Sequence, residues 1–237
     1  MNSSRRLILT VAMLLLLGSL SALRLEYTVK ALGLSVASLT IDKSPSSVRV
    51  KTRSLISNAI FPSIDNVYDV SFDGSYLPQR YQRSVNQGKL KAEISTRYNH
   101  QGKTASQTHS DPKESKQYAI GSHTRDFFSL AAMLSDGKAG AGTYQLDANG
   151  SLWQTKVKSL GSKKIKTRAG SFQAEGYQMS FGSDTHQKPP YVDMITHNLF
   201  HKDSRVELWV DGKGKIVKAS IKKGLRASHW ELESITP

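Results

Sequence analysis

Apolar and polar residues alternate at period two in many short segments of the chain. Examples are Leu25-Tyr27-Val29-Ala31, Val48-Val50, Val206-Leu208-Val210 and the run from Ile216 to Ile221. Such alternation places apolar side chains on one face of an extended segment and is typical of half-buried β-strands. The pattern predicts a mostly β protein.

Turn residues separate these segments at short intervals. Asp73-Gly74, Asn149-Gly150 and the run Asp211-Gly212-Lys213-Gly214 are the clearest. Asn-Gly and Asp-Gly suit tight hairpins, in which the central residues take positive φ. We therefore expect residues 142–146 and 152–157 to form one antiparallel hairpin, and residues 205–209 and 215–222 to form another.

Residues 126–134 break the pattern, because they are rich in Ala and Leu and do not alternate. They predict a short helix that ends before Asp136-Gly137, with Thr124 or Asp126 as its N-cap. Four apolar side chains then share one helix face: Phe127, Leu130, Ala131 and Leu134. We expect this helix to plug a core, the alternative being a mobile lid.

The remaining segments are less regular. Residues 103–122 are polar and are expected to contain a long hairpin loop, and residues 182–190 predict an irregular stretch. No shift in composition marks a linker, and no repeat at a fixed period is present. We expect residues 23–237 to form a single domain.

Residues 1–22 have the order of a secretory signal peptide. Arg5 and Arg6 precede the apolar run 7–17, which only Thr10 interrupts, and small residues lead up to Ala22. The run is shorter than the roughly 20 residues of a membrane-spanning helix. Cleavage is expected after Ala22, or after Ser21, and an uncleaved anchor is the alternative. The sequence thus predicts a periplasmic or secreted protein that is soluble after cleavage.

Charge and cysteine content narrow the class of protein further. Cysteine is absent, so no lipid-modified thiol and no disulfide is expected.

The chain has 33 basic and 19 acidic residues. Two of the basic residues and none of the acidic residues lie in residues 1–22, so the exported part has a net charge of +12. A basic surface favours anionic envelope partners such as lipid, lipopolysaccharide or acidic glycan, unless the charge serves only solubility. Export argues against nucleic acid. The densest basic cluster, residues 163–168, is expected along a solvated strand edge.

Several of these segments occur together in one bacterial family. The matching segments are Leu25 to Val29 with Gly33 to Ala37, residues 73–83, Asp126-Phe127-Phe128-Ser129, residues 167–174 and the hairpin 207–220. The chain resembles the exported domain-of-unknown-function 3108 family over nearly its whole length after residue 22. The resemblance implies a periplasmic, antiparallel, strongly curved sheet or incomplete barrel with one short helix. It supplies no agreed activity and no catalytic residue. Residues 191–201 look like an extra insert, and Ile216-Val217-Lys218 lacks a proline that relatives often place there.

Catalytic motifs are mostly missing. The sequence has no Gly-x-Ser-x-Gly, no phosphate-binding glycine loop after a strand and no cysteine nucleophile. Asp126 and Glu175 are candidates for a glycosidase pair, although a helix cap and an exposed strand carboxylate explain them more simply. Catalysis stays open, a non-enzymatic protein is favoured, and no cofactor is expected.

One histidine pair has the spacing of metal ligands. Asp193, His197 and His201 would share one face of a helix. The pattern lacks the glutamate that follows the first histidine in helical zinc proteases. We expect solvated loop histidines and no metal site, with a local pH-sensitive contact as an intermediate alternative.

Basic and aromatic residues interleave at three places: Arg80-Tyr81-Gln82-Arg83, Arg97-Tyr98 and His229-Trp230. This combination suits stacking on a sugar or contact with a charged head group. The simpler alternative is that Tyr81, Tyr98 and Trp230 pack one face of the sheet. The candidate ligand-binding residues are Arg80, Tyr81, Arg83, Tyr98 and Trp230.

The favoured hypothesis is a non-enzymatic envelope binding or carrier module for an amphiphilic or polysaccharide ligand, with an aromatic cavity and a basic rim. One alternative is a glycan-acting envelope enzyme, and another is an assembly factor that binds a protein through a sheet edge. Contact with a membrane surface is compatible with all three. The sequence gives neither the ligand nor the oligomeric state.

Overall fold

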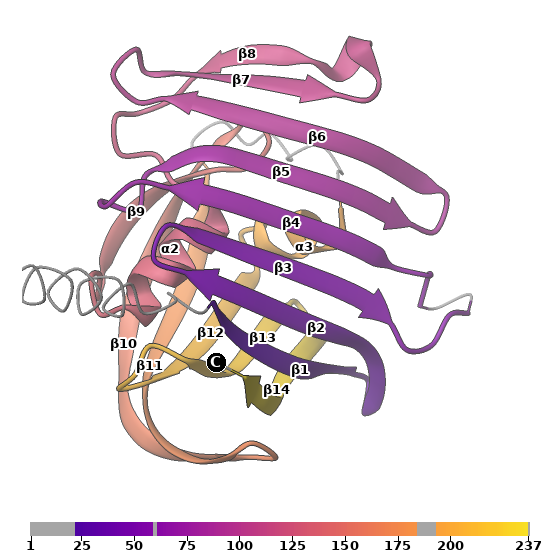
Figure 1. The fold of residues 1–237 in the computed structure, drawn as a ribbon, viewed down its shortest axis with the longest axis vertical. Helices are drawn as coiled ribbons and strands as arrows, with labels where there is room; N and C mark the ends of the chain where they lie inside the picture. Colours follow the sequence, from indigo (N-terminus) through magenta and orange to yellow (C-terminus); the bar gives the residue numbers. More distant parts are fainter. Residues whose placement is uncertain (1–21, 59–60, 184–192, 237) are drawn as a thin grey trace, which may run out of the picture.

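The protein forms one antiparallel sheet of 14 strands that does not close into a barrel (Figure 1). This computed structural model describes residues 22–58, 61–183 and 193–236. The strands of the first half are β1 (Leu23–Ala31), β2 (Leu34–Ser44), β3 (Ser47–Ser54), β4 (Asp65–Phe72), β5 (Pro78–Gln87), β6 (Leu90–Asn99), β7 (Thr104–His109) and β8 (Lys116–Ala119). The predicted antiparallel incomplete barrel is confirmed.

The strands of the second half are β9 (Gly142–Asp147), β10 (Leu152–Thr167), β11 (Gly170–Gly182), β12 (Ser204–Asp211), β13 (Ile216–Lys223) and β14 (Arg226–Thr236). Each half is a run of sequential hairpins, and the pairing of β1 with β14 joins the two. β8 and β9 are therefore the two edges of the sheet.

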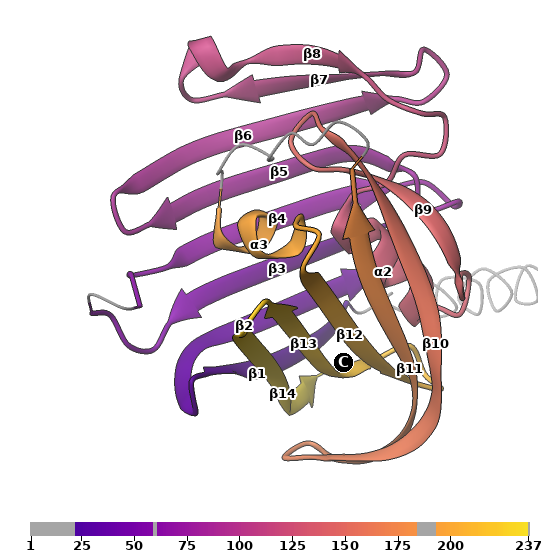
Figure 2. The same ribbon diagram turned by 180° about the vertical axis from the view of Figure 1, so that it is seen from behind.

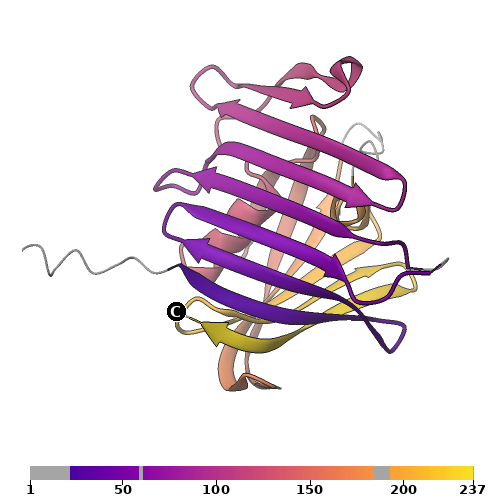
Figure 3. The same ribbon diagram turned by 45° about the vertical axis from the view of Figure 1, so that its right-hand side comes forward.

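The second half curves behind the first, so that the two halves face each other as layers (Figures 1 and 3). β10 and β11 extend past the other strands and arch at the bottom of the view (Figure 1). β9 pairs with β10 only along residues 152–157, so residues 163–167 pair with β11 alone, and Arg168 follows in the turn. These residues lie on a strand edge, as expected.

Helix α2 (Phe127–Ser135) lies between the two layers (Figure 2). Asp126 caps it: its carboxylate accepts hydrogen bonds from the N–H groups of Phe128 and Ser129, and the Ser129 hydroxyl completes a capping box. All but one of its nine residues are buried. The predicted helix is confirmed, and it plugs the core between the layers.

Two segments differ from expectation. Residues 103–122 contain the expected hairpin loop, which holds a 3-10 turn (η1, Pro112–Glu114), but the strands β7 and β8 that flank it were not predicted. The sequence did not indicate these strands because the hairpin has polar residues on both of its faces, which hides the alternation. A second short helix, α3 (Met194–Leu199), lies in the segment interpreted as an insert.

Two expectations concern regions that the structure describes only in part. The predicted signal peptide lies outside the described residues except for Ala22, and the irregular stretch 182–190 does so from residue 184 onward. In the described part of the chain, no helix is long and apolar enough to cross a membrane.

Candidate functional site

The inner face of the sheet changes from apolar to polar between β4 and β8. One row of directly opposed residues runs from Val70 on β4 through Tyr81, Thr96 and Gln107 to Lys116 on β8. Opposed residues of neighbouring strands share a face, so these side chains line the same wall. The wall facing the core is thus apolar at one end and polar at the other.

Arg83 lies in this polar wall and is only 2% exposed. Its guanidinium carbon is 4.8 Å from the centre of the Tyr81 ring. Within the described part of the chain no carboxylate forms an ion pair with it, and its Nε has no hydrogen-bond partner. Burial lowers the pKa of Arg83, and Tyr81 and Asp193 raise it above its ordinary value. The Tyr81 contribution requires an ionised hydroxyl, and because burial raises the pKa of Tyr81 well above the usual range, this contribution is absent at neutral pH. The side chain is a buried cation without a bonded counter-charge.

Tyrosine hydroxyls lie beside this cation. The hydroxyls of Tyr98 and Tyr118 donate to Asp147 Oδ2 at 2.9 and 2.7 Å. Burial raises the pKa of both tyrosines well above the usual range, and the charge of Asp147 raises it further. Both hydroxyls therefore stay protonated and can donate.

These hydrogen bonds bridge the two edges of the sheet. Tyr118 belongs to β8 and Asp147 ends β9, and Lys116 Nζ also donates to the carbonyl oxygen of Asn149 at 2.5 Å. We call this contact the Asp147 seam: Tyr98, Tyr118, Lys116, Asp147 and Asn149. Among the described strands, β8 and β9 are joined by side chains and not by a backbone ladder.

The other side of Arg83 adjoins a second polar group. Tyr68, directly opposite Arg83 on β4, donates its hydroxyl to Asp193 Oδ1 at 3.2 Å. The Asn66 side-chain amide donates to the Tyr68 hydroxyl and to Gln87. Burial, and then the charge of Asp193, raise the pKa of Tyr68. We call Tyr68, Tyr81, Arg83, Thr96, Tyr98 and Gln107 the Arg83 cluster.

The apolar centre of the molecule leaves little free space. α2 and the surrounding strands border a cavity of about 30 Å³. This is room for one or two water molecules. Phe128 of α2 packs edge-on against Tyr81, with ring centres 6.1 Å apart, and so connects this apolar centre to the Arg83 cluster.

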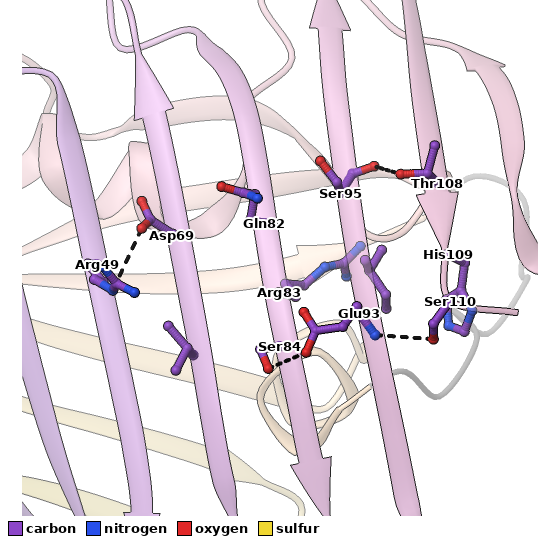
Figure 4. Close-up of a pocket in the computed structure, with 12 residues that line it drawn as sticks. Arg49, Asp69, Gln82, Arg83, Ser84, Glu93, Ser95, Thr108, His109 and Ser110 are labelled. Carbon is purple, nitrogen blue, oxygen red and sulfur yellow. Dashed lines mark hydrogen bonds and ion pairs between the residues drawn. The ribbon is translucent and has the colours of Figure 1, made fainter.

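The outer face of the same strands has shallow polar grooves of about 400 and 450 Å³. Arg49 and Asp69 line both grooves and form an ion pair at 3.7 Å (Figure 4). Glu93 accepts a hydrogen bond from the Ser84 hydroxyl in the first groove. Apart from Arg83, which also lines the first groove, the charged side chains there are already partnered, so these grooves are weaker candidates than the Arg83 cluster.

The structure brings three of the five predicted ligand-binding residues together. Tyr81, Arg83 and Tyr98 lie on the inner wall of β5 and β6. Arg80 lies on the outer face of β5 and is exposed. Trp230 belongs to β14 and is buried in the core, where its ring meets Tyr27 edge-on at 6.2 Å.

Sequence reasoning missed the residues that complete the site. Thr96 follows Ala92 and Ile94 in the period-two alternation of β6, so its inward direction could have been inferred. Tyr118 and Asp147 belong to strands that are far apart in the order of the sheet, and local pattern does not indicate their contact.

The proposed metal ligands do not converge. Asp193 is the N-cap of α3. Its carboxylate accepts hydrogen bonds from the N–H and the hydroxyl of Thr196 and from the hydroxyl of Tyr68. His197 is exposed on α3 beside Lys223, and His201 lies beyond the helix near Asp203. Burial, followed by the charge of Lys223, lowers the pKa of His197. The described residues contain no group of three or more His, Cys, Asp or Glu placed to hold a metal ion.

The family model described as "Protein of unknown function (DUF3108)" matches residues 26–227. The chain belongs to this family. The match covers the strands of the Arg83 cluster and of the Asp147 seam, and the predicted family resemblance is confirmed. No curated protein matches the chain.

One solved structure supports the fold. A β-barrel-like protein of the domain of unknown function DUF1849 from Brucella abortus is 11% identical, with a TM-score of 0.60 over 91% of this chain and 97% of that one. A candidate exported protein with a YmcC-like fold from Bacteroides fragilis is 12% identical, with a TM-score of 0.33 over 92% and 96% of the two chains. A candidate lipoprotein from Parabacteroides distasonis is 10% identical, with a TM-score of 0.35 over 91% and 95%.

Proposed function

We propose that the protein is a non-enzymatic binding module of the cell envelope, and that the Arg83 cluster holds the anionic group of an amphiphilic or polysaccharide ligand. The single observation behind this proposal is the buried Arg83 without a bonded counter-charge. The envelope location rests on the predicted signal peptide.

The proposal follows from the free energy of a buried charge. An ion removed from water without a partner costs several kcal/mol, so such groups are rare unless something binds them. A guanidinium matches the geometry of phosphate and carboxylate groups, to which it can donate two parallel hydrogen bonds. The hydroxyls of Tyr98 and Tyr118 already donate their single protons to Asp147, and that of Tyr68 donates to Asp193, so the guanidinium would be the main donor to the ligand.

The bound part of the ligand is a charged group and not a long apolar chain. The cavity beside α2 holds about 30 Å³, far less than an acyl chain needs. The Asp147 seam offers an entry, because side-chain hydrogen bonds open without breaking a strand ladder. The rest of the ligand would then remain outside this seam.

A glycan-acting enzyme has less support. Asp126 is a helix cap, and Glu175 accepts a hydrogen bond from the Tyr177 hydroxyl at 3.1 Å. Both carboxylates thus have the simpler roles that the sequence suggested.

Native mass spectrometry of protein isolated from its own envelope tests the proposal. We expect an anionic lipid, lipopolysaccharide fragment or acidic glycan to copurify with the native protein and to be lost from the Arg83→Met variant. Arg97→Met is the matched control, because it removes an exposed arginine from the outer face of β6. The mass of the bound species distinguishes the three sources.

Two results would overturn the proposal. One is a native protein that is always free of ligand. The other is an anionic ligand retained equally by Arg83→Met and Arg97→Met, which would place the binding site elsewhere.

A further inference from the structure

Large apolar side chains are exposed at one end of the sheet. Five leucines stand out as exposed: Leu32, Leu34, Leu55 and Leu225, at 53–103% exposure, and Leu160 at 40%. Leu225 is fully exposed at the turn between β13 and β14. Leu32 lies in the turn between β1 and β2, and Leu34 begins β2. Leu55 directly follows β3, and its N–H donates to Val36 of β2.

Sheet register places four of these leucines together. The order β13-β14-β1-β2-β3 is continuous in the sheet. Ala31, at the end of β1, is opposite Ser228 near the start of β14 and opposite Leu34 at the start of β2. The turns after β1, β3 and β13 therefore lie at the same end of adjacent strands. We call Leu32, Leu34, Leu55 and Leu225 the leucine rim.

Local conformation does not explain the leucine at position 32. Leu32 has a φ of 51°, a left-handed conformation that Gly and Asn adopt at lower cost. Gly33 follows with a φ of 79°, so the turn has two positive φ values and would favour Asn-Gly. A large apolar residue that is both exposed and conformationally disfavoured has no role in folding that the structure shows.

Basic residues flank the rim. Leu225 stands in the run Lys222-Lys223-Gly224-Leu225-Arg226. Neither Lys222 nor Arg226 has an ion pair within the part of the chain that the structure describes. Among the acidic residues of this region, Asp203 adjoins His201 and is flanked by Lys202 and Arg205, and Glu231 and Asp65 are paired with Lys30 and Arg53. The charge around Leu225 is thus positive.

We propose that the leucine rim docks the protein onto an anionic lipid bilayer. Leucine side chains at the turn tips enter the boundary between head groups and acyl chains, and Lys222 and Arg226 contact acidic head groups. A protein partner fits less well, because lysine is depleted at protein interfaces, whereas an anionic bilayer attracts it. This proposal does not depend on the Arg83 cluster, which lies on the inner face of other strands.

The absence of cysteine from the chain permits a direct test. A single cysteine is introduced at Leu225 and labelled with a fluorophore that brightens in an apolar medium. Leu160→Cys is the matched control, because Leu160 is an exposed leucine at the bulge of β10, away from the rim. We expect the probe at 225 to brighten with phosphatidylcholine vesicles that contain phosphatidylglycerol, and the probe at 160 to stay unchanged.

Vesicle sedimentation with protein isolated from its own cells adds a second readout. Leu225→Ser should weaken partitioning about tenfold, since a buried leucine side chain is worth about that factor. Lys222→Ser should weaken it about fivefold on anionic vesicles and not on neutral ones. Leu160→Ser should have no effect.

The outcomes separate the bilayer from its alternatives. Equal brightening at positions 225 and 160, or none at either, overturns the proposal. Brightening at 225 with a protein extract of the envelope, but not with any vesicle, would identify a protein partner and equally overturn it.

Discussion

At the scale of single residues, Arg83 is the most deeply buried of the five predicted ligand-binding residues. Its guanidinium stacks on Tyr81 but lacks a bonded carboxylate within the described part of the chain. A cation–π contact offsets only part of the cost of burying the charge. Residues kept for binding commonly lower stability, and Arg83 fits that pattern.

We therefore expect Arg83→Met to raise the free energy of unfolding by about 1–2 kcal/mol. Methionine keeps an unbranched apolar stem beside Tyr81 and removes the charge. Urea denaturation of ligand-free native and variant protein measures the difference. If Arg83→Met instead lowered stability by more than 1 kcal/mol, Arg83 would be a structural residue.

Asp126 makes a second prediction at this scale. Burial raises its pKa from the usual 3.8, although its hydrogen bonds to Ser129 and Phe128 act in the opposite direction. A carboxyl with a raised folded-state pKa stabilises the fold when protonated, and that contribution is lost as pH rises through the folded-state pKa. Asparagine cannot ionise but keeps an acceptor for the helix cap.

The stability of Asp126→Asn relative to the native protein should thus increase between about pH 3 and neutral pH. Urea denaturation at a series of pH values measures it. Asp126→Ala is the control, because it lacks the cap and should lose about 1 kcal/mol relative to asparagine at every pH. A pH-independent difference between Asp126→Asn and the native protein would contradict the raised pKa.

At the scale of elements, the seam between β8 and β9 should be the weakest part of the wall. Tyr118→Phe removes one of two hydroxyl donors to Asp147. A hydrogen bond to a charged group is worth about 1.5 kcal/mol, so backbone amides of β7 and β8 should exchange about tenfold faster. Hydrogen exchange with mass spectrometry measures this.

The control for the seam is Tyr144→Phe on β9, whose hydroxyl donates to the carbonyl of Gly140 and not across the seam. Exchange in β1 and β2 should stay unchanged in both variants. If Tyr118→Phe and Tyr144→Phe accelerated amide exchange in β7 and β8 equally, the hydrogen bonds of the Asp147 seam would not be what stabilises this edge of the sheet.

The sequence indicated the elements better than their contacts. The hairpin around Asn149-Gly150 is β9 with β10, the hairpin around Asp211 is β12 with β13, and α2 lies where alternation fails. The sequence pattern did not predict β7 and β8, because inward-facing residues of this hairpin, such as Gln107, are polar. Tyr81 and Tyr98 were found because each directly follows an arginine in the sequence, whereas Asp147 meets Tyr98 only because the curved sheet brings the end of β9 close to β6 and β8.

At the scale of the whole molecule, β14 joins the two halves of the sheet. It pairs with β13 on one side and with β1 on the other, and it buries Trp230 and Leu232. Truncation before residue 226 would remove both pairings and these two core side chains. Each large core side chain is worth about 3–5 kcal/mol, so the loss should exceed most of the stability of a domain.

The same geometry predicts that the order of the two halves along the chain is unimportant for folding. Arg24 is opposite Thr236, so the start of β1 and the end of β14 are neighbours. The turn between β7 and β8 contains η1, which has no buried residue. Termini are best moved to such exposed turns.

We expect a circular permutant that links residue 236 to residue 23 and opens at residues 112–114 to keep the far-ultraviolet circular dichroism spectrum and unfold cooperatively. The truncated chain should show neither property. A permutant that fails to fold would mean that the β1–β14 pairing must form between the two chain ends rather than within a continuous segment.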